Sequence, residues 1–300
     1  MKVNQLIDIV TRMQPNLQID EVKTKINGWD NDILILNNEV VYRFPKSKGV
    51  AAKVKDEVAL ISQLLLESPL VQIPRYESVY LDGEFLGVKY DYLDGESLTD
   101  SEVINFIKPQ NAEIIGDFLT KLHSIDLSKF KGTKIVPIHT KEYWEDLYSS
   151  VETIVFPYLK QSQKKEINHL FKHFFSNSIF SSTSKKVLIH GDLTIANILF
   201  QKDKGLVSGI IDFTDAQVGD PAFDFAGLYW SLGPDFTSEV LSYYQVKDKE
   251  SIFNRVQSFY GLQPIFHNLL YAIKENIYVD WETVLDRFSY LYSIRNNRFK

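Results

Sequence analysis

Three residues in the second half of the chain combine types and spacing that could perform chemistry. Asp192 follows a short apolar run, Asn197 comes five residues later, and Asp212 follows a second apolar run, 206–211. Carboxamide and carboxylate oxygens are hard ligands of the kind that Mg²⁺ takes, and Mg²⁺ keeps further positions for waters and phosphates. Asn197 and Asp212 therefore form a candidate magnesium site. Asp192 is left free to orient an attacking hydroxyl or to accept its proton, the division of work found in phosphoryl transfer.

The elements that must position these residues are predicted from β-rich runs. Runs 186–193 and 206–213 flank the turn 201–205 and predict a hairpin that brings the two clusters together. His190 lies in the extended part of the first run, so its side chain is expected to point away from Asp192 and to serve as a structural hydrogen-bond partner. Further aspartates follow within the same thirteen residues as Asp212, and they are candidates for scaffold or substrate contacts: Asp215, Asp220 and Asp224.

The rest of the chain changes from strand-like to helical patterning. Two β-rich runs surround Asn37-Asn38, and two more surround Asp82-Gly83, both of which are hairpin signals. Between them, 50–67 has helical spacing, with an apolar stripe of Val54, Val58, Ile61 and Leu65. Helical patterns dominate after Asp94, at 111–125, 141–178 and 223–300. This order predicts an α+β fold with two lobes: a small β-rich lobe of residues 1–93 and a larger, mainly helical lobe of residues 94–300.

Composition limits the class of function. The 300 residues are 44% hydrophobic and include no apolar run of the roughly 18 residues that a membrane span needs. The chain has no cysteine, which excludes disulfides, thiol catalysis and cysteine-metal sites, and fits a cytoplasmic protein. A net charge of −6 disfavours nucleic acid as a partner and is compatible with a cationic small molecule. With 16 Tyr and 20 Phe, apolar pockets are available as well. We expect a monomer.

The motifs together resemble a known family. "HGDLTIANILF", followed by "IIDF", is similar to the catalytic loop and metal-binding motif of the protein-kinase-like superfamily, and above all to the aminoglycoside phosphotransferase family, which includes macrolide phosphotransferases. Four further segments match in the same order over residues 20–230: "INGWDNDILIL", "VVYRFPKS", "LTKLHSI" and "GDPAFDFA". The resemblance implies a bilobal protein-kinase-like fold with the nucleotide bound by the smaller lobe.

The resemblance also implies roles for single residues. Asp192 would be the catalytic base, and Asn197 and Asp212 the Mg²⁺ ligands. Arg43 would contact the phosphates of ATP or GTP, with Glu57 orienting it. The remaining nucleotide-binding candidates are Gly28 and Asp30 in the covering loop, Lys46 as a rival cation, and Tyr90 and Tyr92 in the segment facing the base.

Three departures from the family pattern bear on the nucleotide site. Arg43 stands where many members carry Lys, and its planar guanidinium can bind phosphate at two points. The covering loop 27–32 has a single glycine, Gly28. Protein kinases read Asp-Phe-Gly at the metal site, whereas this chain reads Asp212-Phe213-Thr214.

Two other classes are disfavoured. A protein kinase needs a long activation segment after Asp212, but "GDPAFDFA" follows within a few residues. A non-catalytic kinase-like binding module would have lost at least one of the base and metal residues, and all three are present. His169 and His173 are four apart in a helical segment, but no third ligand lies nearby, so surface histidines are the simpler interpretation.

The acceptor molecule is the open choice. An aminoglycoside is expected from the family, and Asp215, Asp220 and Asp224 could line a cleft for a polycation. The apolar segment 228–236, with Tyr229 and Trp230, instead favours a partly apolar acceptor such as a macrolide. A sugar, or a choline-like quaternary ammonium held by aromatic rings, is a further alternative.

Overall fold

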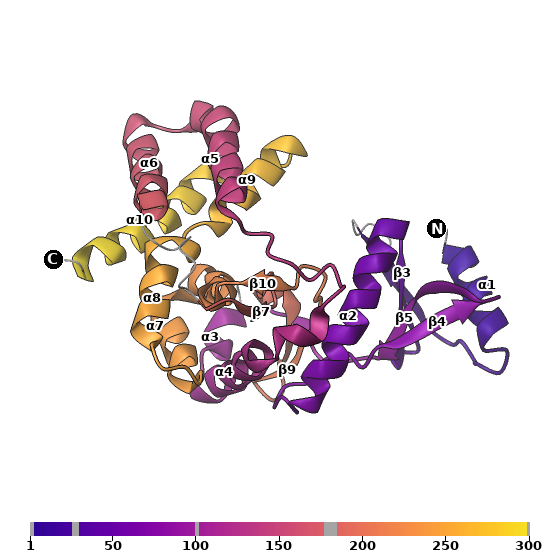
Figure 1. Cartoon of the computed structure of the whole chain (residues 1–300). Coiled ribbons are helices and arrows are strands. Elements are labelled where there is room, and N and C mark those ends of the chain that lie inside the picture. The colour runs from indigo at the N-terminus through magenta and orange to yellow at the C-terminus, as the bar shows by residue number, and fades with distance from the viewer. Residues whose placement is uncertain (1–2, 26–29, 100–101, 177–184, 299–300) are drawn as a thin grey trace.

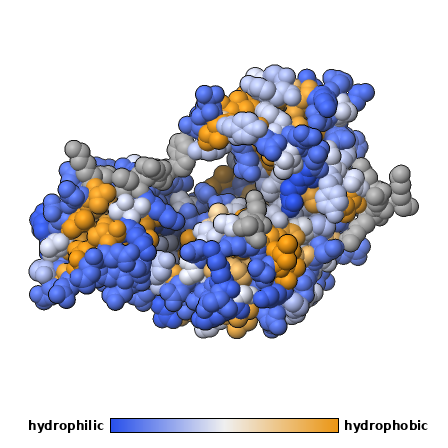
Figure 2. Space-filling view, turned by 180° about the vertical axis from the view of Figure 1, so that it is seen from behind, coloured by the Kyte–Doolittle hydropathy of each residue, from blue (hydrophilic) through white to orange (hydrophobic). Residues whose placement is uncertain are grey.

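A computed structural model describes residues 3–25, 30–99, 102–176 and 185–298. The chain forms a small part built on an antiparallel sheet and a larger helical part, as predicted (Figure 1). In the space-filling view, the surface is hollowed between these two parts (Figure 2). No helix among the described residues is long and apolar enough to cross a membrane.

The N-terminal sheet contains five strands in the order β1-β2-β3-β5-β4. They are β1 (Val22–Lys25), β2 (Asn31–Leu36), β3 (Val40–Pro45), β4 (Glu77–Leu81) and β5 (Glu84–Asp91). Both predicted hairpins are confirmed. Asn37 and Asn38 adopt φ of 55° and 53°, and Asp82 and Gly83 adopt 52° and 83°, the left-handed conformations that two-residue hairpin turns require. Helix α1 (Val3–Met13) buries Leu6 and Val10 in the small core of this part.

Helix α2 (Lys48–Leu66) packs beside this sheet, with Ser47 as its N-cap (Figure 1). Its predicted stripe is only partly right, because Val58 and Leu65 are half-buried. The buried face consists of Val54, Glu57, Leu60, Ile61 and Leu64. A glutamate therefore occupies the inner face of the helix, where it meets Arg43 on β3.

Two small sheets carry the polar clusters in the larger part. Strand β8 (Ile198–Gln201) pairs with β9 (Leu206–Ile210) across the predicted turn, and β6 (Glu96–Ser97) joins β8. Strand β7 (Val187–Ile189) pairs instead with β10 (Gln217–Gly219). The prediction of a single hairpin was therefore wrong in detail. The loop that carries Asp192 connects β7, which pairs with β10, to β8, which pairs with β9. The chain passes from the N-terminal sheet to the small sheets between β5 and β6.

Helices make up the remainder of the larger part. Helices α4 (Pro109–Ser124) and α7 (Ala226–Tyr243) pack together beneath the small sheets, and α7 kinks at Gly233-Pro234. In Figure 1, α5, α6, α9 and α10 gather on the side away from the N-terminal sheet. The other helical elements are α3 (Val103–Phe106), η2 (Leu127–Phe130), α5 (Lys141–Ser150), η3 (Val151–Val155), η4 (Phe156–Tyr158), α6 (Gln161–Ser176), η6 (Ile195–Asn197), η7 (Pro221–Phe225), α8 (Lys249–Arg255), η8 (Val256–Tyr260), α9 (Pro264–Lys274) and α10 (Trp281–Arg298).

Candidate active site

The loop after β7 is held in place by a buried carboxylate. Asp224 accepts hydrogen bonds from the backbone N–H of His190 at 2.7 Å and of Gly191 at 2.9 Å. It is 1% exposed, and its Oδ2 also lies 3.0 Å from Nε2 of His123. Burial alone would raise the pKa of Asp224, but the His123 hydrogen bond and the backbone N–H groups outweigh it and lower the pKa. The loop that carries Asp192 is therefore anchored at its first two residues.

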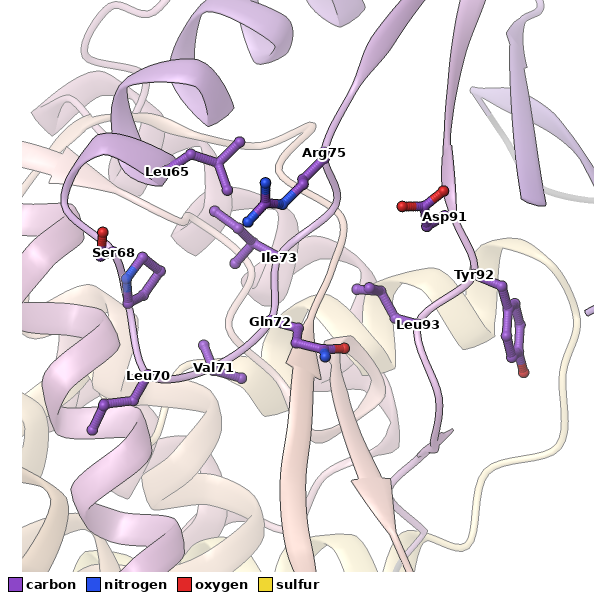
Figure 3. Close-up of a pocket in the computed structure, with 11 residues that line it drawn as sticks. Leu65, Ser68, Leu70, Val71, Gln72, Ile73, Arg75, Asp91, Tyr92 and Leu93 are labelled. Carbon is purple, nitrogen blue, oxygen red and sulfur yellow. The ribbon is translucent and has the colours of Figure 1, made fainter. Parts of the chain in front are cut away.

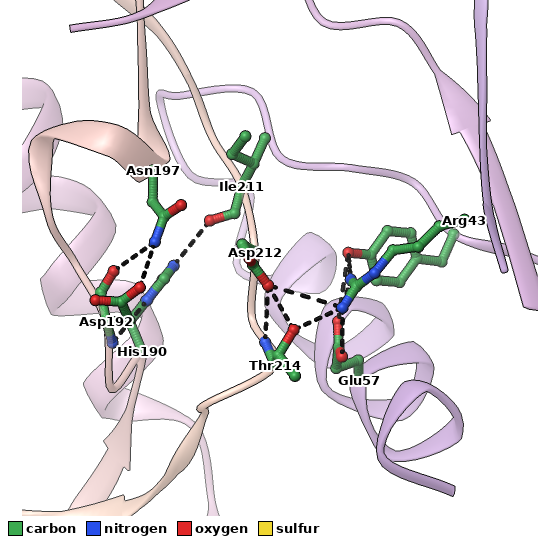
Figure 4. A network of polar contacts seen from close by, with 9 residues as sticks. Arg43, Glu57, His190, Asp192, Asn197, Ile211, Asp212 and Thr214 are labelled. Carbon is green, nitrogen blue, oxygen red and sulfur yellow. Dashed lines mark hydrogen bonds and ion pairs between the residues drawn. The ribbon is translucent and has the colours of Figure 1, made fainter. Parts of the chain in front are cut away.

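Asp192 and Asn197 are joined across this loop. The Asn197 amide nitrogen donates to both the backbone oxygen and Oδ2 of Asp192, each at 2.8 Å (Figure 4). Burial, followed by the nearby Asp215, raises the pKa of Asp192 to about 7. A carboxylate with this pKa can accept a proton near neutral pH.

Asp212 is brought to the same place from β9. Ile211 N–H donates to the Asn197 carbonyl at 3.0 Å, which ties the two segments together. The His190 ring lies between them, fully buried, with Nε2 3.2 Å from the Ile211 carbonyl oxygen. Its Nδ1 accepts from the backbone N–H of Asp192 at 3.3 Å, so His190 is the hydrogen-bond partner that was predicted, but the expectation that its side chain points away from Asp192 was wrong. The Asp212 side chain is about half exposed and points toward Thr214 and Arg43 (Figure 4).

The oxygens of Asn197 and Asp212 fit a magnesium ion that arrives with a nucleotide. The Asn197 nitrogen is used by Asp192, so the amide oxygen is the atom that can face a metal. Among the described residues, no group of three or more His, Cys, Asp or Glu side chains could hold a metal alone. Mg²⁺ is typically held by one or two protein oxygens together with waters and phosphate oxygens, so this small donor set suits it.

Arg43 forms the centre of a buried polar network behind Asp212. Its two terminal nitrogens donate to the two carboxylate oxygens of Glu57, at 2.8 and 3.1 Å. The same guanidinium donates to Tyr76 Oη at 3.0 Å and to Thr214 Oγ1 at 2.6 Å. Burial acts to lower the pKa of Arg43, but Tyr76 and Glu57 outweigh it, so the pKa is raised and the charge is kept.

A cavity of about 360 Å³ opens on this network. Five of the predicted residues line it: Asp30, Arg43, Tyr90, Asp212 and Asp215. Ile33 and Ile211 add two apolar side chains from opposite lobes, which are suited to the faces of a flat base. Burial raises the pKa of Tyr90 to about 12, so its hydroxyl stays protonated.

Of the other nucleotide-binding candidates, the two that the structure describes lie elsewhere. Gly28 lies outside the described residues. Lys46 places its Nζ 3.4 Å from Asp32 Oδ1 and does not line this cavity. Tyr92 lines a different cavity of about 410 Å³, between the end of α2 and the exit of β5, together with Gln72, Arg75 and Asp91 (Figure 3).

Comparisons with known proteins agree with this geometry. Residues 24–256 match the phosphotransferase enzyme family. The chain belongs to this family. It is 24% identical over 152 residues to viomycin phosphotransferase of Streptomyces vinaceus, a match that spans half of each chain.

Solved structures of the family share the fold. The GDP complex of wild-type aminoglycoside 2'-phosphotransferase-IIIa is 23% identical, with a TM-score of 0.78 over 99% of this chain and 100% of that chain. A macrolide 2'-phosphotransferase from Brachybacterium faecium is 17% identical, with a TM-score of 0.65 over 95% of this chain and 98% of that chain. At these identities the likeness establishes the protein-kinase-like fold.

A second cavity, of about 720 Å³, lies on the other side of Asp192. Asp192, Asp215 and Trp230 are the predicted residues that line it. Its walls include residues that the sequence gave no reason to single out: Lys53, His139, Tyr143, Phe223, Gln263 and His267. They come from segments far apart in the sequence, and no local motif marks them. Solved structures with this fold include one with GDP and kanamycin and one with streptomycin and ATP, so we refer to this cavity as the candidate acceptor cavity.

The other predicted substrate residues do not line this cavity. Asp220 is buried and accepts from Nε and a terminal nitrogen of Arg255, at 2.8 and 3.0 Å. Asp224 is the buried anchor of the catalytic loop. Tyr229 is fully buried in the core, one residue from the cavity-lining Trp230. His169 lies on the surface of α6, with Nδ1 3.0 Å from the Tyr292 hydroxyl.

Proposed function

We propose that this chain transfers the γ-phosphoryl group of ATP or GTP to a hydroxyl group of a small molecule. One observation supports the proposal most directly. Asp215 lines both the 360 Å³ and the 720 Å³ cavities, Asp212 lines the first, and Asp192, whose Oδ2 accepts from Asn197, lines the second. A donor in the first cavity and an acceptor in the second would therefore react beside Asp192.

The residues divide the work as phosphoryl transfer requires. The acceptor oxygen bonds to the γ-phosphorus, the bond from that phosphorus to the oxygen bridging to the β-phosphate breaks, and the acceptor proton passes to Asp192. Asn197 and Asp212 would hold Mg²⁺, which when bound neutralises charge on the phosphate oxygens. Arg43, fixed by Glu57, supplies positive charge at the back of the donor cavity.

For the acceptor we propose a hydroxyl-bearing antibiotic, with an aminoglycoside as the first candidate. The solved structures with this fold include complexes with kanamycin, streptomycin and gentamicin, and the curated relative acts on viomycin by its name. The net charge of −6 is compatible with such cationic molecules.

A macrolide is the second candidate, and the lining of the acceptor cavity favours it. The walls contain the aromatic rings of Tyr143, Phe223 and Trp230, with Asp192 and Asp215 as the carboxylates. Asp220 and Asp224 are already paired inside the protein and cannot add negative charge to this cavity. An acceptor with an apolar face would bury that face against the rings.

The test combines a turnover screen with one variant. ATP and GTP are each offered with kanamycin, gentamicin, erythromycin, choline and a simple sugar, and release of nucleoside diphosphate is followed in a coupled assay. Asp192→Ala should lose acceptor-stimulated turnover while still binding nucleotide by calorimetry. Retained turnover would remove Asp192 from its assigned role, and no stimulation by any acceptor would count against the proposed function.

A further inference from the structure

Thr214 links the two charged groups of the donor cavity. Its Oγ1 accepts a hydrogen bond from Arg43 and donates one to Asp212 Oδ1 at 2.5 Å (Figure 4). The backbone N–H of Thr214 also approaches the same Asp212 oxygen, at 3.4 Å. The direct approach of Arg43 to Asp212 is longer, at 3.7 Å, so the hydroxyl provides the closer connection.

The guanidinium of Arg43 has no freedom to move toward Asp212. Four of its donor directions are taken by Glu57, Tyr76 and Thr214. The Asn31 amide oxygen, in the orientation that satisfies both its ends, accepts from the fifth donor, Nε, at 3.0 Å. Arg43 is therefore held in one position by its partners, and the Thr214 hydroxyl connects it to the Asp212 carboxylate.

The Asp212 side chain is held only weakly by its own surroundings, so a hydrogen bond to Thr214 can decide where the carboxylate lies. Its backbone φ is 65°, a left-handed conformation that is uncommon for a non-glycine residue, and its side chain is 53% exposed. Protein kinases have a glycine at the place of Thr214, which offers no hydroxyl.

We infer that Thr214 is a positioning residue that holds the Asp212 carboxylate at a fixed distance from Arg43 and so presets the magnesium site. The inference rests on the proposed function, because it assigns Asp212 to the metal. It predicts that Thr214→Val, which keeps the shape and removes the hydroxyl, weakens the metal contribution to nucleotide binding. Loss of a partner that orients a metal ligand typically costs about 10- to 100-fold in affinity.

The readout is binding rather than turnover. ATP and GTP affinities are measured by calorimetry with Mg²⁺ and with EDTA, for the wild type, Thr214→Val and Thr214→Ser. The ratio of the two affinities should fall about tenfold or more in the valine variant and return in the serine variant, which keeps the hydroxyl. Thr237→Val is the matched control, because its Oγ1 donates to Gly233 O at 2.8 Å in a buried helix that holds no donor-cavity residue.

Several results would overturn the inference. These are an unchanged ratio in the valine variant, a ratio that serine does not restore, or an equal loss in the Thr237 control. A wild-type affinity that does not depend on Mg²⁺ would overturn it together with the metal assignment. Failure of every acceptor in the turnover screen would refute the proposed function alone, since the binding comparison uses no acceptor.

Discussion

The anchoring of the catalytic loop by Asp224 can be tested by a change of one atom. In Asp224→Asn the side chain keeps its shape, but one carboxylate oxygen becomes an NH₂ group. With the amide oxygen at the Oδ2 position, the hydrogen bonds from His190 N–H and from His123 Nε2 can be kept. The NH₂ group then faces Gly191 N–H, which now lies 2.9 Å from Oδ1, so two donors oppose each other and neither has an acceptor.

The size of the effect follows from these contacts. A buried donor left without an acceptor costs about 1–3 kcal/mol. The two remaining hydrogen bonds change from charge-assisted to neutral and lose roughly half of their strength. We expect the free energy of unfolding to fall by about 3 kcal/mol, a large share of the 5–15 kcal/mol that is typical of folded proteins. Because Asp192 follows Gly191 directly, we also expect kcat/KM of the folded protein to fall about 100-fold.

Asp220 provides the matched control. It is a buried carboxylate in the same 3₁₀ segment, and it accepts from Arg255 and from Ala222 N–H rather than from the catalytic loop. Asp220→Asn should lose stability of similar size in urea denaturation, while kcat/KM of its folded form stays at the wild-type value. The reasoning is refuted if Asp224→Asn keeps wild-type kcat/KM, or if both variants lose activity equally.

Two further predictions concern the same region. Gly191 has φ of 83°, and a Cβ there would lie 2.1 Å from the Asp215 carbonyl oxygen, so Gly191→Ala should cost at least about 2 kcal/mol of unfolding free energy. Gly132→Ala, with φ of 89° and nothing within 4 Å of the new Cβ, should cost less, and an equal loss would exclude the clash as the cause. Burial lowers the pKa of His139 from 6.5 to about 4. Between pH 6.5 and 4 the unfolded chain therefore binds a proton at this residue and the folded chain does not, so the free energy of unfolding falls as the pH is lowered through this range. His139→Asn should flatten that decline in urea titrations at several pH values, and an unchanged decline would exclude His139 as its cause.

Features encoded by neighbouring residues could be predicted from the sequence. The Asn37-Asn38 hairpin follows from the tolerance of Asn for positive φ, which needs no distant partner. The spacing from Asp192 to Asn197 gives a loop whose own hydrogen bonds close it, Asn197 Nδ2 to Asp192 O among them. Such features depend on a few consecutive residues, so the chemistry of the loop could be inferred before the fold was known.

Features that depend on distant partners were missed. The Arg43–Glu57 pair was predicted from the family resemblance, but the apolar spacing of the helix placed Val58 rather than Glu57 on the buried face, because spacing alone does not show that Arg43 meets Glu57 with two hydrogen bonds. The pairing of β7 with β10 could not be foreseen either, because the run at 217–219 is short and its partner lies almost thirty residues earlier.

The three aspartates after Asp212 illustrate the limit most clearly. They are the same residue type within ten positions, but Asp215 faces the cavities while Asp220 and Asp224 are buried. What separates them is the presence of Arg255 and His123, which reach them from helices more than thirty residues away. A carboxylate can bind a substrate only if no internal cation or hydrogen-bond donor is already paired with it. The sequence does not show which of the three aspartates have such an internal partner.

The same reasoning explains why the reaction is better defined than the acceptor. The reacting groups lie on one loop and one strand end, tied together by backbone hydrogen bonds such as Ile211 N–H to Asn197 O. Besides the loop itself (191–196), the candidate acceptor cavity is lined by α2, the segment before α5, η7, the start of α7 and the start of α9. Gly227 at the start of α7 packs against Leu193 O of the loop, so a substitution there would shift the loop, whereas Lys53 of α2 and His267 of α9 make no hydrogen bond that holds it. On the proposed function, we expect substitutions at the α2 and α9 positions to change acceptor preference more than they change the geometry around Asp192, with the aromatic and acidic side chains of the cavity deciding the direction.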